Sequence, residues 1–149
     1  MSTSPVAAPH PPSASAPIAR RNAALKNLVE VSGRVLLSVL FLLSGVGKLG
    51  AYKATAAYMA SVGVPGALLP AVIAIELLGS LGIILGWKTR AAAVLLAGFS
   101  VLTALIFHNN FGDQIQMIMF LKNISIAGGL LLLVVNGPGP LSIDRRFTR

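Results

Sequence analysis

Four ionisable side chains lie inside or directly beside the apolar stretches of this sequence: Lys48, Glu76, His108 and Lys122. Lysine and histidine can donate hydrogen bonds to a carbonyl group or an oxyanion, whereas a carboxylate or a neutral imidazole can accept a proton. An isolated charge in an apolar environment is costly, so such groups persist where they pair or take part in function. We therefore treat these four residues as a candidate polar site.

The residue types that usually hold a redox cofactor or a metal are scarce. The sequence has no cysteine, which excludes thiolate chemistry, iron–sulfur clusters and cysteine-ligated zinc in this chain. The second histidine, His10, lies in a region rich in proline, alanine and serine, so a haem with two axial histidines is not expected. No HExxH, Walker or dinucleotide-binding pattern occurs in a usable context. We predict no metal site, no covalently bound cofactor and no electron transfer by this chain alone.

Composition places the candidate site in a membrane protein. Of the 149 residues, 55% are hydrophobic and 11% are charged. The mean hydropathy of +0.81 is above that of soluble domains of this length. The net charge is +8, but the basic residues flank the apolar stretches instead of gathering on a polar surface with aromatic residues. The sequence thus predicts one membrane domain and argues against nucleic acid as a partner.

Four apolar stretches are long enough to cross the hydrocarbon core of a bilayer as helices. They cover residues 31–50, 67–86, 91–107 and 115–135. The stretch 51–66 is too short and too polar to span, and its helical spacing predicts a short surface-lying or re-entrant helix. Because the turn after residue 86 is very short, the second and third spans must run antiparallel. The expected fold is all-α, a polytopic membrane protein with four transmembrane helices in an antiparallel bundle.

The ends of the chain are polar and set the expected orientation. Residues 1–24 are predicted to be a disordered tail rich in proline, alanine and serine, residues 25–144 the membrane domain, and residues 145–149 a basic tail. Four spans place both tails on one side of the membrane. Nine of the twelve basic residues fall on that side, and only Lys48, Lys53 and Lys122 fall on the other. The positive-inside rule therefore predicts cytoplasmic N- and C-termini.

The candidate residues fall at related depths. Counting from the ends of the spans puts Glu76 about 15 Å deep, near the midplane, and Lys122 about 10 Å from the outer end of its span. Lys48 and His108 lie near the outer ends of theirs, so all four share the outer half. Small or polar residues share their helical faces, which favours faces turned inward. These neighbours are Ser44, Ser80 and Asn123.

Each residue also has an interpretation without a site. Lys48 is close enough to the membrane surface to reach it with its ammonium group, and His108 could be an interfacial hydrogen-bonding residue. Lys122 is deeper, which favours a role inside the bundle. Glu76 could be a protonated carboxyl group that joins helices, or an ionised one that pairs with Lys122 or Lys48. Pairing is the interpretation that we favour.

Several motifs, in their order along residues 33–144, resemble the DoxX family of small bacterial inner-membrane proteins. They are LFLLSGVGKL, GVPG, IELLGSLGIILG, the histidine after the third span, LKNISIAGGLLLL and GPGPLSID. The resemblance implies a four-helix protein of the bacterial cytoplasmic membrane. It also implies that the family's characteristic polar positions fall on Lys48, Glu76, His108, Lys122 and Asn123. Some redox-associated relatives carry cysteines, which this chain lacks.

Relatives implied by this resemblance include a subunit of a thiosulfate:quinone oxidoreductase and proteins associated with oxidative-stress complexes. The resulting expectation is an accessory or quinone-linked subunit in membrane redox metabolism, whose outer polar pocket receives a quinone headgroup or a small anion. Its partners would be the lipid bilayer and either a redox subunit or a second copy. One alternative is an assembly protein whose buried charges only fix helix pairing, and another is a small-solute transporter that works as an oligomer. The sequence does not decide whether the chain is an enzyme.

Overall fold

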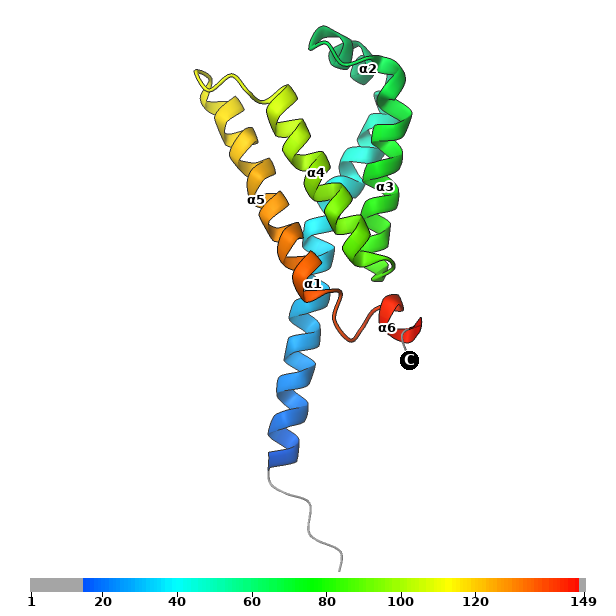
Figure 1. The fold of residues 1–149 in the computed structure, drawn as a ribbon, viewed down its shortest axis with the longest axis vertical. Coiled ribbons are helices and arrows are strands. Elements are labelled where there is room, and N and C mark those ends of the chain that lie inside the picture. Colours follow the sequence, from blue (N-terminus) through cyan, green and yellow to red (C-terminus); the bar gives the residue numbers. More distant parts are fainter. Residues whose placement is uncertain (1–14, 148–149) are drawn as a thin grey trace, which may run out of the picture.

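The computed structural model describes residues 15–147, which form helices joined by short loops (Figure 1). The elements are α1 Ser15–Gly50, α2 Tyr52–Ser61, the 3₁₀ turn η1 Gly66–Leu68, α3 Leu69–Leu85, α4 Thr89–Phe107, α5 Gln114–Asn136 and α6 Ile143–Phe147. Within this part of the chain, four segments are long and apolar enough to cross a membrane: α1, η1 with α3, α4 and α5. The predicted all-α fold with four spans is confirmed.

The first helix is longer than the apolar pattern predicts. α1 begins at Ser15 instead of near residue 31, so residues 15–24, expected in the tail, are helical. These residues include alanine, leucine, arginine and lysine, which favour helices. Pro17 lies in the first turn, where its missing N–H has no intrahelical partner to lose. This part of α1 projects beyond the other helices (Figure 1). The remainder of the predicted tail, residues 1–14, lies outside the described residues.

The helices pack as two pairs. α1 packs along α3 and α4 packs along α5, while α3 and α4 join the two pairs and α1 scarcely contacts α5. Leu96 of α4 lies so close to Gly79 of α3 that a Cβ atom there would come within 2.9 Å of it, so the small residue permits this approach. Ile83, Leu96 and Leu130 form the centre of the core. Toward the end that carries α2, the two pairs separate (Figure 1).

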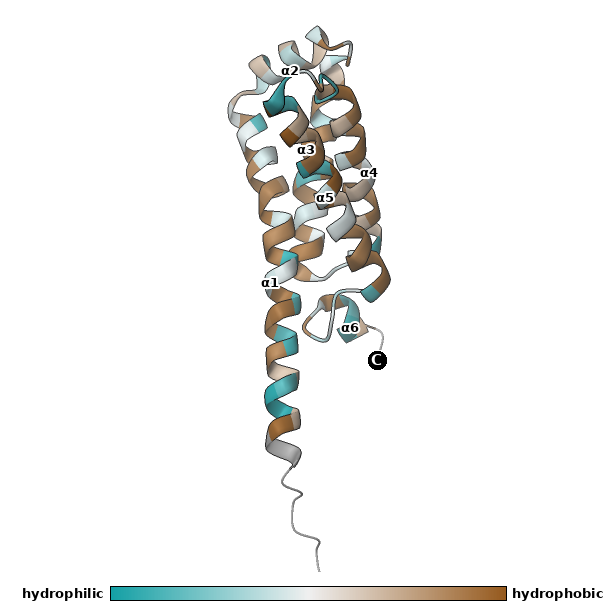
Figure 2. Ribbon diagram, turned by 90° about the vertical axis from the view of Figure 1, so that its left-hand side faces the viewer, coloured by the Kyte–Doolittle hydropathy of each residue, from teal (hydrophilic) through white to brown (hydrophobic). Residues whose placement is uncertain are grey.

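The short helix expected between the first two spans is present as α2. It lies across the end of the bundle, where Met59 is buried against Leu69 and Ile73. Figure 2 shows hydrophobic residues along most of α3, α4 and α5, and hydrophilic residues on the N-terminal part of α1 and on α6. We refer below to the two ends of the bundle as the α2 end and the α6 end.

At the α6 end, residues 137–147 form a strap across the helix termini. Asp144 accepts hydrogen bonds from the backbone N–H of Lys88 at 2.6 Å and of Thr89 at 2.9 Å, and from Thr89 Oγ1 at 2.8 Å. The Asp144 N–H donates to the carbonyl oxygen of Gly86 at 2.8 Å. One carboxylate from the end of the chain thus caps α4 and fixes the α3–α4 turn.

The strap also holds α1. The guanidinium of Arg34, buried within the protein, donates from Nη2 to the carbonyl oxygen of Leu141 at 2.6 Å. Gly86 lies against this contact with a φ of 70°, and a Cβ atom there would collide with Arg34 and Ser142. Only glycine fits a left-handed position with so little space. The α6 end is therefore closed by contacts among α1, the α3–α4 turn and the strap.

Candidate functional site

The centre of the candidate site is an ion pair between α1 and α3. Lys48 Nζ lies 2.8 Å from Glu76 Oε1 and 2.9 Å from Oε2. Lys48 also donates to Ser44 Oγ at 2.6 Å, and the Ser44 hydroxyl donates to Glu76 Oε1 at 3.0 Å. Glu76 is only 3% exposed. The predicted pairing of Glu76 is made with Lys48, which satisfies the carboxylate within the protein.

Helix geometry explains how these three side chains meet. Ser44 and Lys48 are one turn apart on α1, and side chains on a helix lean toward its N-terminus, so Lys48 reaches back over Ser44. Glu76 faces them from the middle of α3. Removing one partner of a buried ion pair leaves an uncompensated charge, which typically costs about 3 to 5 kcal/mol. The pair consequently holds α1 and α3 together while both charges are present.

A cavity of about 580 Å³, which we call the bundle cavity, opens between the two helix pairs beside this ion pair. Its polar lining includes six of the seven residues that the sequence singled out: Ser44, Lys48, Glu76, His108, Lys122 and Asn123. Most of the remaining lining is apolar or aromatic, with Phe41, Phe99 and Phe107 among it. The structure thus brings these predicted site residues to one apolar cavity with a few polar groups.

His108 ends α4 at the mouth of this cavity. Its Nδ1 lies 2.9 Å from Oε1 of Gln116, near the start of α5. Because an amide oxygen accepts, His108 donates from Nδ1, and in the neutral imidazole Nε2 is then an acceptor. Nε2 of the neutral His108 can therefore accept a hydrogen bond from another partner.

Lys122 differs from Lys48 in having no carboxylate beside it. It is exposed on α5, and its Nζ lies 3.1 Å from the sulfur of Met119. The sequence has four acidic residues, and all four lie in the described part of the chain with other partners. Glu76 pairs with Lys48, Glu30 with Lys26, Asp113 with the first amides of α5, and Asp144 with the first amides of α4. No carboxylate of residues 15–147 is left to neutralise Lys122.

Two further predicted residues bond to their own helices. Asn123 is buried and donates from Nδ2 to the carbonyl oxygen of Met119 at 3.0 Å. Ser80 is fully buried and donates to the carbonyl oxygen of Leu77 at 3.0 Å. It does not line the bundle cavity, since it lies one helical turn from Glu76 toward the α6 end. The structure therefore leaves Ser80 out of the site.

The sequence pattern missed the contribution of α2 and the middle of α4. Thr55 and Tyr58 of α2 line the cavity, as does Thr103 of α4. The Tyr58 ring packs on Phe107 with ring centroids 5.7 Å apart. The helical spacing of Thr55, Tyr58 and Met59 was the available signal, because three or four residues separate positions on one helix face.

The chemistry open to this cavity is hydrogen bonding and proton transfer. Lys48 and Lys122 can donate to a carbonyl group or an oxyanion, and His108 can accept a proton at Nε2. Within residues 15–147, no three histidine, aspartate or glutamate side chains gather where they could hold a metal ion. The arrangement suits a ligand with an apolar body and an oxygen-bearing headgroup.

Comparison with known proteins assigns the chain to a family. The DoxX family model matches residues 30–109. The chain is 46% identical over 128 residues to inner membrane protein YqjF of Escherichia coli, covering 84% of this chain and 98% of that protein. It is 38% identical over 130 residues to inner membrane protein YphA of the same organism, covering 83% of this chain and 93% of that protein.

A third relative is more distant. The ER-derived vesicles protein ERV29 of Saccharomyces cerevisiae is 30% identical over 79 residues, which cover 50% of this chain and 26% of that protein. No solved structure matches the chain. The family model and the nearly complete coverage of the two bacterial relatives agree with each other. This chain is therefore a multi-pass inner-membrane protein that belongs to the DoxX family.

Proposed function

We propose that the bundle cavity binds a membrane-soluble molecule of the quinone class and that the protein serves as an accessory, quinone-linked subunit in membrane redox or oxidative-stress metabolism. The observation that carries this proposal is Lys122, a cation on the wall of an apolar cavity for which residues 15–147 provide no free carboxylate. Lys48 and Glu76 neutralise each other, so the charge of Lys122 gives the cavity a net positive charge.

A quinone provides what such a cavity lacks. An ammonium group in an apolar setting is stabilised by an anion or by a strongly polar oxygen. A quinone offers polar carbonyl oxygens, and a deprotonated quinol offers an oxyanion. The volume of about 580 Å³ is within the usual range for ligand pockets. The aromatic lining would contact the ring, and the space between the separating helix pairs would admit a lipid-soluble tail.

The protein would supply binding and proton transfer, and a partner would supply electrons. Reduction of a quinone to a quinol takes up two electrons and two protons. His108 is placed to exchange a proton through Nε2, because Nδ1 is occupied by Gln116. Lys122 and Lys48 would orient the carbonyl groups. The residues of this chain include no cysteine and no histidine pair in the spans, so the electrons would come from a redox subunit.

A titration of the purified protein with a short-chain quinone tests this function. Calorimetry should show saturable binding to the native protein that weakens at least tenfold in Lys122→Ala. Lys53→Ala is the matched control, because Lys53 is an exposed lysine of α2 that does not line the cavity. Absence of saturable binding to the native protein would favour the alternative of an assembly protein. The observation that favours that alternative is the Lys48–Glu76 pair, which is satisfied without any ligand.

The orientation of the chain belongs to the same proposal. We infer that the α6 end faces the cytoplasm, because eight of the eleven basic residues in the described part of the chain lie toward it. The bundle cavity then opens in the outer half of the membrane. Since the chain has no cysteine, single cysteines at Ser4 and Thr148 report the sidedness directly. An impermeant thiol reagent should label neither in intact cells and both after lysis; labelling of both in intact cells would reverse the orientation.

A further inference from the structure

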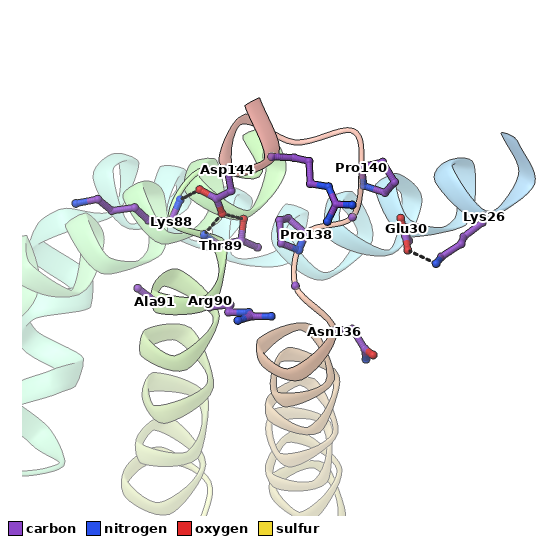
Figure 3. A pocket seen from close by; sticks show the side chains of 13 residues that line it. Lys26, Glu30, Lys88, Thr89, Arg90, Ala91, Asn136, Pro138, Pro140 and Asp144 are labelled. Carbon is purple, nitrogen blue, oxygen red and sulfur yellow. Dashed lines mark hydrogen bonds and ion pairs between the residues drawn. The ribbon is translucent and has the colours of Figure 1, made fainter. Parts of the chain in front are cut away.

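A second cavity lies at the α6 end, far from the site described above. It has a volume of about 600 Å³ and is formed by α1, the start of α4, the loop after α5 and α6 (Figure 3). We call it the basic pocket. The charged residues that line it are Lys26, Glu30, Lys88, Arg90, Asp144 and Arg145.

The two carboxylates of the basic pocket differ in how they are engaged. Asp144 accepts the hydrogen bonds of the α4 N-terminus, as described above. Burial alone would raise the pKa of Asp144, but hydrogen bonds from Thr89 and Lys88 and the charge of Arg34 together hold it below its ordinary value. Glu30 Oε1 lies 3.8 Å from Lys26 Nζ. Its Oε2 is buried and has no hydrogen-bond partner among the described residues, so the ion pair that Glu30 forms is with Lys26 and not with an arginine of the pocket.

Among the described residues, the two arginines of the pocket have no ionic partner. Figure 3 shows Arg90 pointing from α4 toward the end of α5, where its Nη2 lies 3.4 Å from the carbonyl oxygen of Val135. Arg145 of α6 lines the same space. No carboxylate of residues 15–147 lies within 4.0 Å of either arginine. Lys88 points away from the pocket, and its Nζ lies 5.4 Å from the centre of the Trp87 ring.

The surroundings of the pocket are those of a membrane interface. Trp87, beside the pocket, and Phe147, on α6, are both exposed, and aromatic side chains next to basic ones are typical of the headgroup level. Leu132 and Val135 are exposed on the last turns of α5, whose final residue, Asn136, lines the pocket. A molecule whose headgroup entered the pocket could lay an acyl chain along these residues. A free anion would make no use of this apolar surface.

From these contacts we propose that the basic pocket binds the phosphate group of an anionic phospholipid from the leaflet at the α6 end. Arginine is suited to this role because its planar guanidinium forms paired hydrogen bonds with phosphate oxygens. Arg90 and Arg145 reach the phosphate from opposite walls, and Lys26 adds charge beside Glu30. The lipid then fills the gap between α1, α4 and α6, and its chains pack on α5. The same phosphate chemistry could also attract soluble phosphate, so the test separates the two sources.

The test compares short-chain phosphatidylglycerol, short-chain phosphatidylcholine and inorganic phosphate on the purified full chain in a neutral detergent. Binding is followed by native mass spectrometry and by the ligand-induced shift in Tm. We expect saturable binding of phosphatidylglycerol and a preference over phosphatidylcholine. Replacing both arginines, as Arg90→Gln with Arg145→Gln, should weaken it on the order of thirty-fold, given the contribution of each basic residue near an anionic lipid.

The matched control is Arg21→Gln with Arg146→Gln, which removes the same charge from the same end at exposed residues outside the pocket. This control should keep the lipid preference, and the conservative Arg90→Lys variant should keep most of the binding. Equal loss in both double variants would show unspecific charge attraction and overturn the proposal. Equal binding of the two lipids would also overturn it. Binding of inorganic phosphate as tight as that of phosphatidylglycerol would assign the pocket to a soluble anion instead.

Discussion

The two ends of the bundle use polar residues in opposite ways. At the α6 end, the hydrogen bonds of Asp144 and Arg34 join the strap after α5 to α1 and to the α3–α4 turn. At the α2 end, the strongest polar contact is Lys48–Glu76, which joins α1 and α3. Those two helices are already packed along each other, so the ion pair cannot draw α4 and α5 toward them. At the α6 end, by contrast, Arg34 connects α1 to the strap after α5, and α1 and α5 scarcely touch elsewhere.

The largest effect on stability is expected from breaking the Lys48–Glu76 ion pair at the α2 end. Lys48→Met should lower the free energy of unfolding by about 3 to 5 kcal/mol, because it leaves the buried Glu76 without its cation. Glu76→Gln should cost less, about 1 to 3 kcal/mol, since a neutral amide keeps some hydrogen bonds. Unfolding of each variant in detergent measures these values.

The double variant Lys48→Met with Glu76→Gln is the control for that prediction. It should recover much of the loss, because no charge is then left unpaired. Strictly additive losses in the double variant would show that the two residues do not depend on each other.

The next effect concerns the closed end. Gly86→Ala should lower the free energy of unfolding by roughly 3 kcal/mol, because the new Cβ atom meets a left-handed backbone and the Arg34 and Ser142 contacts. Gly98→Ala is the matched control, since a Cβ atom at this glycine of α4 meets nothing within 4 Å. It should be neutral or stabilise by less than about 1 kcal/mol. Similar Tm values for both variants would mean that the strap does not hold the bundle.

A smaller effect distinguishes the two aspartates that cap helices. Asp144→Ala should cost about 2 kcal/mol, because Asp144 joins the end of the chain to α4, whereas Asp113→Ala should cost about 1 kcal/mol, since it caps α5 locally. Equal costs would show that the strap adds nothing beyond an ordinary helix cap.

The contribution of Asp144 should also depend on pH. The pKa of Asp144 is lower in the folded protein than its ordinary value of 3.8. As the pH falls, the unfolded chain therefore binds the proton first, so this contribution is full above about pH 4 and is lost progressively below it. The free energy of unfolding should change less between pH 6 and pH 3 in Asp144→Ala than in the native protein. An unchanged difference would contradict the assignment.

The smallest effect on stability is expected at Lys122. Lys122→Ala should change the free energy of unfolding by less than about 0.5 kcal/mol, because within residues 15–147 the only polar contact of its Nζ is the sulfur of Met119. The same variant should lose quinone binding. A loss of stability as large as that of Lys48→Met would instead reveal a structural partner for Lys122 and would make the two lysines equivalent.

The sequence predicted the spans well because apolar runs and their ends have a clear physical signature. α4 and α5 begin and end within about two residues of the predicted positions, where Thr89, His108 and Asp113 interrupt the apolar pattern. The early start of α1 was not predictable from hydropathy, since it depends on helix-forming polar residues. The burial of Arg34 was also hidden, because its partner Leu141 lies 107 residues away and contributes only a backbone carbonyl.

The sequence predicted most of the polar residues that line the bundle cavity, and less of their geometry. Helical spacing placed Ser44 with Lys48, and the cost of an isolated charge required a partner for Glu76. The sequence pattern could not decide whether Lys48 or Lys122 pairs with Glu76, because periodicity within one helix carries no information on how the helix pairs separate. The same limit explains Ser80, which shares a face with Glu76 but lies below the cavity. Thr55 and Tyr58 were missed because the stretch that forms α2 was predicted only as a surface-lying or re-entrant helix, with no role in the site.

The ion pair also bears on how this protein is made. Lys48 leaves the ribosome 28 residues before Glu76. Because Lys48 lies near the end of α1, it can extend its ammonium group to the lipid headgroups until Glu76 has been synthesised. Glu76 cannot reach the headgroups in this way, because it lies in the middle of α3. An unpaired carboxylate at this depth raises the free energy of transferring the helix from water into lipid. Pairing with Lys48 of α1, which is already in the bilayer, therefore lowers the free-energy cost of inserting α3.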